Sequence, residues 1–270
     1  MLSWFSSSPR KKGANMKSYL VFRLYGALAS WGVEAVGENR PTSTYPTRSA
    51  ILGLLGAALG IRRDDETQLA ALQQSVKIAI KQVVSGLLLR DYHTAQVPSQ
   101  EKKQAHLTRK SELSDKAKLN TVLSSRDYLA DGVWVIAISL TEPTSFTLSA
   151  LRDALVKPVF TLSLGRKSCP PALPMSPQLA EYPSLKAALD TPFPSLPQSE
   201  KSNYYWRRNY EVVSYWWEGD KNEIDIPDAT VLTHQLWNEP LSRDRWQFTQ
   251  LTIHQVSLPS LPVEGTHVPV

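Results

Sequence analysis

The sequence predicts an α+β protein: a ferredoxin-like, RRM-like body with an inserted β-hairpin or arm and a β-rich C-terminal extension. Two observations support this fold class. Segments of strand and helix character follow one another in the order strand, helix, strand, strand, helix, which is the order of a βαββαβ unit. Between two of the strands lies a polar and basic stretch, residues 95–125, without an apolar face. Such a stretch is expected to project from the body.

The first strand and the first helix are predicted close to the N-terminus. Residues 19–25 are largely apolar and include aromatic residues, as is typical of a buried strand. The pair Pro46-Thr47 precedes an uncharged run, residues 50–61, and a proline followed by a hydroxyl residue indicates a helix start, because the hydroxyl can accept from a first-turn amide. Gly60 stands where a helix of about three turns would end.

The start of this helix is the first candidate binding site. Free backbone amides, hydroxyl groups and arginines would meet there, and a helix start of this kind can bind phosphate. The residues concerned are Arg40, Arg48 and Ser49. A Walker loop is excluded, because the pattern G-x-x-x-x-G-K-[ST] does not occur. The alternative is a capped core helix whose arginines are merely solvated, and both interpretations remain open at this point.

Four more elements complete the predicted body. Acidic residues open a second helical stretch, residues 64–75, as the helix dipole prefers. Residues 76–83 mix apolar and basic side chains at near-alternate spacing, which indicates a half-exposed strand. The clearest strand is 132–140, and a short helix follows at 149–156. The predicted arm lies between the strands 76–83 and 132–140, and its polar stretch, residues 95–125, contains six lysines and arginines but only three acidic residues.

The second half of the chain is richer in proline and in aromatic residues. Eight prolines lie between Pro170 and Pro197, around one short helical patch at 184–189. An aromatic segment, 204–217, is expected to be extended, and a last strand is expected at 251–256. The predicted organisation is a flexible extension (1–15), a body (16–170) that contains the arm (86–127), a proline-rich connection with a β-rich segment (171–256) and a disordered tail (257–270).

The composition limits the classes of function that the protein can have. The net charge of +5 favours a polyanionic partner. The single cysteine, Cys169, cannot form an internal disulfide. No segment is long and apolar enough for a membrane span, which needs about 20 residues, and Arg23 interrupts a stretch that imitates a signal peptide, so we expect a cytoplasmic protein. The histidines lack the spacings of metal ligands, so we expect no metal and no cofactor.

Basic and aromatic residues gather at the junctions of the predicted elements. Arginine binds phosphate through a forked contact, and an aromatic ring offers a base a face for stacking. An RRM-like sheet with such a rim suits single-stranded RNA. The candidate RNA-binding residues are Trp31, Arg40, Arg48, Ser49, Arg90, Tyr92, His93, Arg126, Tyr128, Gly165, Arg166 and Lys167. For the run Ser125-Arg126-Asp127-Tyr128, an Arg–Asp pair at the base of the arm is the alternative interpretation.

Catalysis is considered at one further place. The run Arg90-Asp91-Tyr92-His93-Thr94 combines a histidine with a tyrosine, and with a nearby lysine such groups could cleave RNA without metal through general acid–base chemistry. A single histidine in a strand is more often a hydrogen-bonding or stacking residue. No nucleophile elbow, G-x-S-x-G, occurs.

Four motifs in one order resemble a known family. They are Pro46-Thr47-Arg48-Ser49 with the apolar run 52–56, Leu89-Arg90-Asp91-Tyr92-His93-Thr94, Arg126-Asp127-Tyr128-Leu129, and Leu164-Gly165-Arg166-Lys167-Ser168-Cys169-Pro170. In this the chain is similar to the CRISPR-associated RAMP-superfamily subunits that cap the 5′ handle of the guide RNA (crRNA) in type I-E Cascade, the antiviral surveillance complex. The resemblance covers residues 16–171 and is weaker beyond them, where it rests on Pro240 to Arg245 and on Gln247-Phe248.

The resemblance implies a palm, which is the RRM-like body, and a thumb, which is the arm. It implies that the thumb displaces a base where handle and spacer meet, that Arg48, Ser49, His93 and Arg126 face the crRNA, and that Gly165 to Lys167 line the path of the handle. The implied partners are the crRNA 5′ handle, the backbone RAMP subunit and the large subunit, with target DNA contacted only indirectly and no membrane. Segment 204–217 is expected to face a partner subunit.

The resemblance also bears on catalysis. In type I-E a separate protein cuts the precursor RNA, so no catalytic residue and no enzymatic activity are expected here. In the type I-C relative, the equivalent subunit cuts RNA with tyrosine, lysine and histidine. A metal-independent endoribonuclease that processes CRISPR repeat RNA therefore remains the alternative function.

Overall fold

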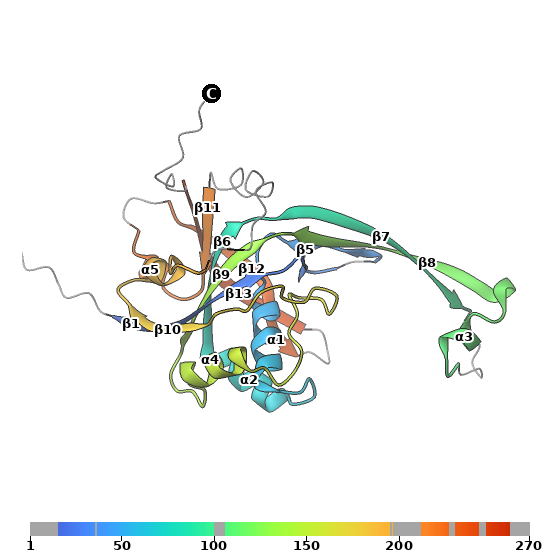
Figure 1. Cartoon of the computed structure of the whole chain (residues 1–270), viewed down its shortest axis with the longest axis horizontal. Helices are drawn as coiled ribbons and strands as arrows, with labels where there is room; N and C mark the ends of the chain where they lie inside the picture. The colour runs from blue at the N-terminus through green and yellow to red at the C-terminus, as the bar shows by residue number, and fades with distance from the viewer. Residues whose placement is uncertain are drawn as a thin grey trace, which may run out of the picture.

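A seven-stranded antiparallel sheet forms the centre of the protein (Figure 1). The computed structural model describes residues 16–35, 37–99, 106–194, 196, 212–226, 230–242 and 247–259. The spatial order of the strands is β10-β1-β9-β6-β11-β13-β12. Their bounds are β1 (Lys17–Tyr25), β6 (Val76–Val84), β9 (Val133–Leu140), β10 (Gln178–Tyr182), β11 (Val212–Trp217), β12 (Leu232–Ser242) and β13 (Gln247–Pro259). The predictions for residues 1–15 and 204–211, and for the tail beyond residue 259, lie outside the described residues.

Helices cover both faces of this sheet. On one face lie α1 (Arg48–Leu59), α2 (Glu66–Ser75) and α4 (Leu148–Val156), and on the other lies the short α5 (Leu185–Leu189) (Figure 1). Because successive side chains of a strand point to opposite faces, β1 contributes to both layers. Its residues Leu20 and Phe22 belong to the buried cluster of α1, α2 and α4, whereas Tyr19 and Val21 belong to the cluster of α5.

The first helix, α1, ends where the sequence predicts but begins differently. At its end, Gly60 has φ +78° and donates its N–H to Ala57 O; an added Cβ there would lie 2.8 Å from Cγ1 of Val159. At its start, Thr47 makes no side-chain cap. Its hydroxyl lies 3.2 Å from that of Ser49 instead, so the expected hydroxyl cap is not formed.

Four strands of this sheet, β10, β1, β9 and β6, are called the palm here, and they have the order of a βαββαβ unit. Along the chain, β1 is followed by α1 and α2, then by β6 and β9, then by α4 and β10, and in space these strands lie as β10-β1-β9-β6. The sequence places residues 178–182 in a proline-rich connection, whereas they form β10, which pairs with β1 from Lys17 to Val21. Most of β10 is exposed, so it lacks the run of buried apolar residues by which a strand is recognised.

The C-terminal strands extend the palm sheet. β11 pairs with β6, and β13 pairs with both β11 and β12. The predicted last strand, 251–256, is the middle of the longer β13, which continues to Pro259. Residues 257–259, which the sequence assigns to the tail, therefore belong to the sheet.

The arm is a long two-stranded ribbon that reaches away from the palm (Figure 1). Its strands are β7 (Leu87–Pro98) and β8 (Leu119–Ala130), and at its far end lie α3 (Arg109–Glu112) and the 3₁₀ turn η1 (Lys116–Lys118). At its base, the second edge of β8 pairs with β2 (Leu28–Ala29) and β4 (Asn39–Arg40). A small ladder, β3 (Trp31–Gly32) with β5 (Thr42–Ser43), lies in the same part of the sequence.

Candidate nucleic-acid interface

Three of the predicted arginines gather at the base of the arm. Arg40 of β4 and Arg126 of β8 are partners in the parallel pairing of these strands. Arg166 donates from Nη2 to the carbonyl oxygen of Arg40 at 3.0 Å. Its guanidinium lies 5.0 Å from the centre of the Tyr128 ring. Three segments far apart in sequence thus bring their cationic side chains to one surface, which we call the arm-base surface (Arg40, Arg126, Arg166 and the exposed Lys167).

A tight backbone contact holds the loop that carries Arg166. Gly165 has φ +86°, and an added Cβ would lie 1.9 Å from the carbonyl oxygen of Ser30. Ser30 donates its N–H to Leu164 O at 3.0 Å and its hydroxyl to Asp127 O at 2.9 Å. Only glycine combines this φ with so close an approach. Gly165 therefore acts by allowing the loop to pack on Ser30, which places Arg166 over Tyr128.

The predicted RNA-binding residues of the arm lie on two opposite faces of the ribbon. Residues directly opposite each other in paired strands share a face, and neighbours along a strand alternate. Arg126 lies opposite Asp91, and Arg90 lies opposite Asp127. Arg90 and Tyr92 therefore point to the face opposite to that of Arg126. From the sequence, these residues are predicted to lie together in one RNA-binding site. In the structure, the alternation of side chains along the strands puts them on opposite faces of the ribbon.

Arg90 is bound by a carboxylate. Its Nε and Nη2 donate to the two oxygens of Asp127 at 2.7 and 3.0 Å. The hydrogen bonds from Arg90 hold the pKa of the Asp127 carboxyl below its ordinary value, with a further contribution from the charge of Arg166. The Arg–Asp pair at the arm base thus exists, but it joins Asp127 to Arg90 across the strands.

Two exposed aromatic groups remain on the arm. Tyr92 is 67% exposed and is available for stacking. The ring of His93 lies with its Nδ1 3.7 Å from a carboxylate oxygen of Asp91. Because Tyr92 and His93 are neighbours in a strand, their side chains point to opposite faces. They do not converge on one scissile bond, and this geometry disfavours the acid–base pair that the endoribonuclease interpretation needs.

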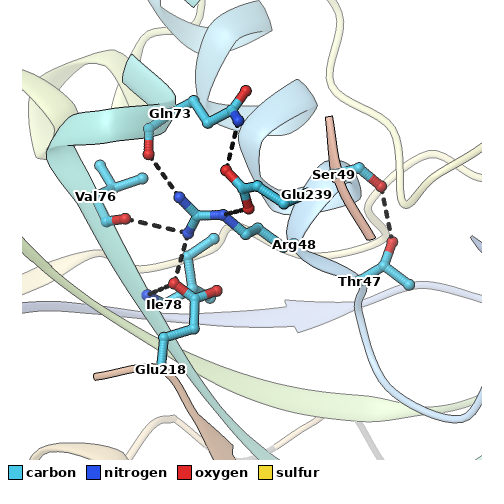
Figure 2. A network of polar contacts seen from close by, with 8 residues as sticks. All are labelled: Thr47, Arg48, Ser49, Gln73, Val76, Ile78, Glu218 and Glu239. Atoms are coloured by element: carbon cyan, nitrogen blue, oxygen red, sulfur yellow. Dashed lines mark hydrogen bonds and ion pairs between the residues drawn. The ribbon is translucent and has the colours of Figure 1, made fainter. Parts of the chain in front are cut away.

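Arg48 is not at the surface, and its predicted role as a phosphate ligand is wrong. Its guanidinium lies between the carboxylates of Glu218 and Glu239, with Nη1 and Nε each 2.5 Å from an oxygen (Figure 2). It also donates to the carbonyl oxygens of Val76 and Gln73. Ser49 next to it is partly buried and lies against Thr47. The helix start faces the sheet, so acids of the C-terminal half, and not phosphate, neutralise Arg48.

Two predicted stacking residues are also buried. Trp31 is 1% exposed and meets Trp134 edge-on, with 5.1 Å between the ring centres. Tyr128 is buried too, with Arg166 over its ring. Neither ring is free to stack on a base. Tyr128 instead supports Arg166, and Trp31 is part of the palm core.

Sequence reasoning missed the residues that position the arginines. Ser30, Glu218 and Glu239 were not among the candidates, and Asp127 was named only in the alternative of an Arg–Asp pair at the base of the arm. Asp127 carries a signal in the sequence, since it lies between Arg126 and Tyr128. The two glutamates have no local signal, because their partner lies 170 positions from the first of them.

In the described part of the chain, no group of three or more His, Cys, Asp and Glu side chains is placed to hold a metal ion. No helix among the described residues is long and apolar enough to cross a membrane.

Fold and surface together define a mixed α/β protein with mostly antiparallel sheets, a projecting arm and an arginine-rich surface at its base. The chain belongs to the Cas5 family of CRISPR-associated proteins, because the family model described as CRISPR-associated protein (Cas_Cas5) matches residues 19–253. It is 38% identical over 168 residues to the CRISPR system Cascade subunit CasD of Escherichia coli (strain K12). The aligned region covers 59% of this chain and 70% of CasD.

Solved structures have the same fold. A chain of a CRISPR RNA-guided surveillance complex matches with a TM-score of 0.55 and 24% identity, over 90% of both chains. A crystal structure of a Cas protein matches with a TM-score of 0.52 and 23% identity, over 90% of this chain and 95% of the other. The family resemblance seen in the sequence motifs is confirmed by the family model and by the identity with CasD.

Proposed function

We propose that this chain is the non-catalytic crRNA-binding subunit of a type I-E Cascade surveillance complex. It grips the repeat-derived 5′ handle and contacts the backbone and large subunits of this cytoplasmic antiviral complex. Membership of the Cas5 family and the identity with E. coli CasD support this function. In this proposal the central sheet is a RAMP palm and the ribbon of β7 and β8 is its thumb.

The observation that carries the proposal is the arm-base surface. Arg40, Arg126 and Arg166 come from three segments to one place, and Asp127, the acid beside them, is bound to Arg90 on the other face. Asp91 lies opposite Arg126, but among the described residues no ion pair joins Arg40, Arg126 or Arg166 to a carboxylate. Guanidinium groups in this state are suited to a phosphate chain, because each offers a fork of N–H donors to phosphate oxygens.

Arg166 is already held in place for this role. Its guanidinium is fixed by the Tyr128 ring and by the carbonyl oxygen of Arg40. Its Nη1 is buried without a hydrogen-bond partner among the described residues, and the side chain as a whole is partly exposed. A side chain that is fixed before binding loses little rotamer freedom on binding. We assign Arg166 as the anchor of one phosphate and Arg126 as the contact to the next, with Lys167 at the rim of the loop.

The opposite face has a separate role. Tyr92 stands exposed there, next to the neutralised Arg90. We assign Tyr92 to the stacking of a base that the thumb displaces, which contributes roughly 1–3 kcal/mol per base in single-strand binding. The RNA backbone then follows the arm-base surface, while the displaced base stacks on Tyr92 on the opposite face of the ribbon.

The test is guide-RNA binding with matched variants. Arg126→Ala and Arg166→Ala should each weaken binding about tenfold or more, whereas Arg62→Ala, an arginine with a largely exposed side chain on the α1–α2 connection, should leave it within about twofold. Equal losses in all three variants would contradict the assigned surface.

A cleavage assay separates the alternative function. CRISPR repeat RNA incubated with the protein in EDTA should stay intact. Specific cutting that His93→Ala abolishes would establish the endoribonuclease instead.

A further inference from the structure

Among the described strands of more than two residues, three have a free sheet edge, and one of them differs from the others. β10 and β12 end the seven-stranded sheet, and β7 ends the sheet of the arm. β10 has only five residues, and β12 carries two register shifts against β13. β7 runs for twelve residues and pairs with β8 without a register shift. Short length and irregular pairing protect an edge from further strands, so β10 and β12 are protected and β7 is not.

The side chains of β7 do not protect it either. Residues 87–97 contain no lysine and no proline, the residues that most often block an edge. At its start, Leu87, Leu88 and Leu89 are 60%, 63% and 45% exposed. Because neighbours in a strand point to opposite faces, these leucines flank the free edge on both sides.

We propose that the outer edge of β7 is a docking site for an extended segment of a neighbouring protein subunit, which adds to the arm as a further strand. Unpaired backbone N–H and C=O groups along a strand match another strand, and apolar side chains on either side of them match its side chains. The partner is a different subunit of the ribonucleoprotein, and this part of the inference rests on the proposed function.

Charge favours a protein at this edge over RNA. Residues 87–98 carry one arginine and one aspartate, and that arginine, Arg90, is bound to Asp127. This leaves no excess positive charge for phosphate. The arm-base surface lies along the other edge of the ribbon, where Arg126 of β8 pairs with Arg40 of β4. The two edges can therefore be occupied at the same time, one by RNA and one by protein.

Hydrogen exchange on the isolated chain and on the assembled complex tests the docking site. In an antiparallel pair, every second amide of β7 points away from β8. In residues 87–93, those outward amides should exchange fast in the isolated chain and at least tenfold more slowly in the complex. Fast exchange in both states would overturn the proposal, since nothing then docks. Slow exchange already in the isolated chain would also overturn it, since the chain then covers its own edge.

A pair of variants separates docking from RNA binding. Leu88→Lys should reduce co-purification of the neighbouring subunits at least tenfold, while the affinity of the isolated chain for guide RNA stays within twofold. Val156→Lys makes the same change at an equally exposed residue of α4 and should leave both unchanged. An equal loss of subunits in the two variants would overturn the proposal. A loss of RNA affinity in Leu88→Lys would also overturn it. The same holds if the free chain associates with itself and Leu88→Lys abolishes this association. If the unmodified chain fails to bind guide RNA, the proposed function fails and not the docking edge.

Discussion

Arg48 and Glu218 form a buried ion pair although they are 170 positions apart in the sequence, with Nη1 of the guanidinium 2.5 Å from Oε2 of the carboxylate. Glu239 closes the other side of Arg48, and Oε2 of Glu218 also accepts from the N–H of Ile78. Figure 2 shows these groups around one guanidinium. The network joins the start of α1 to the strands of the C-terminal half, and so it holds the extension of the sheet to the palm.

Loss of Arg48 should therefore reduce stability and not RNA contact. At pH 8, above the pKa of Glu218, Arg48→Ala leaves two carboxylates buried without a counter-charge, and removing one partner of a buried pair costs about 3–5 kcal/mol. Urea unfolding should show this loss, whereas Arg62→Ala at an exposed site should change the free energy of unfolding by less than about 0.5 kcal/mol. A folded Arg48→Ala protein of normal stability that no longer binds guide RNA would contradict the buried role.

The pH dependence of stability should have a component from Glu218. Burial raises the pKa of this carboxyl from 4.5 to about 7, and the charge and hydrogen bond of Arg48 only partly oppose that rise. The folded state then holds a proton that the unfolded state has lost. The contribution of Glu218 is therefore full below pH about 4.5 and is lost as the pH rises to about 7.

Glu218→Gln is the variant that checks this sign. Unfolding of the parent protein between pH 5 and pH 8 should show the decrease in stability with rising pH, and Glu218→Gln should flatten it. A parent protein whose stability rises steadily over this range, with the same slope in Glu218→Gln, would show that Glu218 is ionised throughout.

The two arginines on opposite faces of the arm should differ in their effect on RNA binding. Arg126→Ala should weaken the affinity for guide RNA about tenfold and lower the slope of log affinity against log salt by about 0.7, the value for one phosphate on a single strand. Arg90→Ala should weaken it by less than about threefold, because Arg90 is already neutralised by Asp127. Filter binding at several salt concentrations measures the affinity and its salt dependence for each variant. A larger effect of Arg90→Ala than of Arg126→Ala would show that the RNA backbone lies on the face of Arg90.

Gly165→Ala should disturb the loop that positions Arg166. The new methyl group would lie 1.9 Å from the carbonyl oxygen of Ser30, at a φ of +86°, so the loop must move or the fold must lose about 1–3 kcal/mol. We expect lower thermal stability together with weaker guide-RNA binding. Gly53→Ala is the control: its Cβ meets nothing within 4 Å, and in a helix this change should stabilise by about 0.5–1 kcal/mol. Normal RNA binding by Gly165→Ala would show that Arg166 does not depend on this contact.

Much of the palm could be predicted from local patterns. β1, β9 and the helices α1 and α4 have buried apolar runs or helix signals that are complete within a few residues. The arm was predictable because its sequence lacks an apolar face, so it could not be part of the core. β10 was not predictable in this way, because it is an exposed edge strand that exists only through its pairing with β1.

The sequence by itself determined the order of elements, the projecting arm and the family motifs, because each of these is encoded by residues close to one another in the chain. Only the tertiary structure decided which arginines remain available for RNA. Arg48 and Arg166 both stand in short polar runs at the junction of two elements. One is enclosed by acids that follow far along the chain, and the other is held at the arm base by a backbone carbonyl and a ring. Contacts between distant segments leave no local trace in the sequence, since they arise only when the sheet brings those segments together.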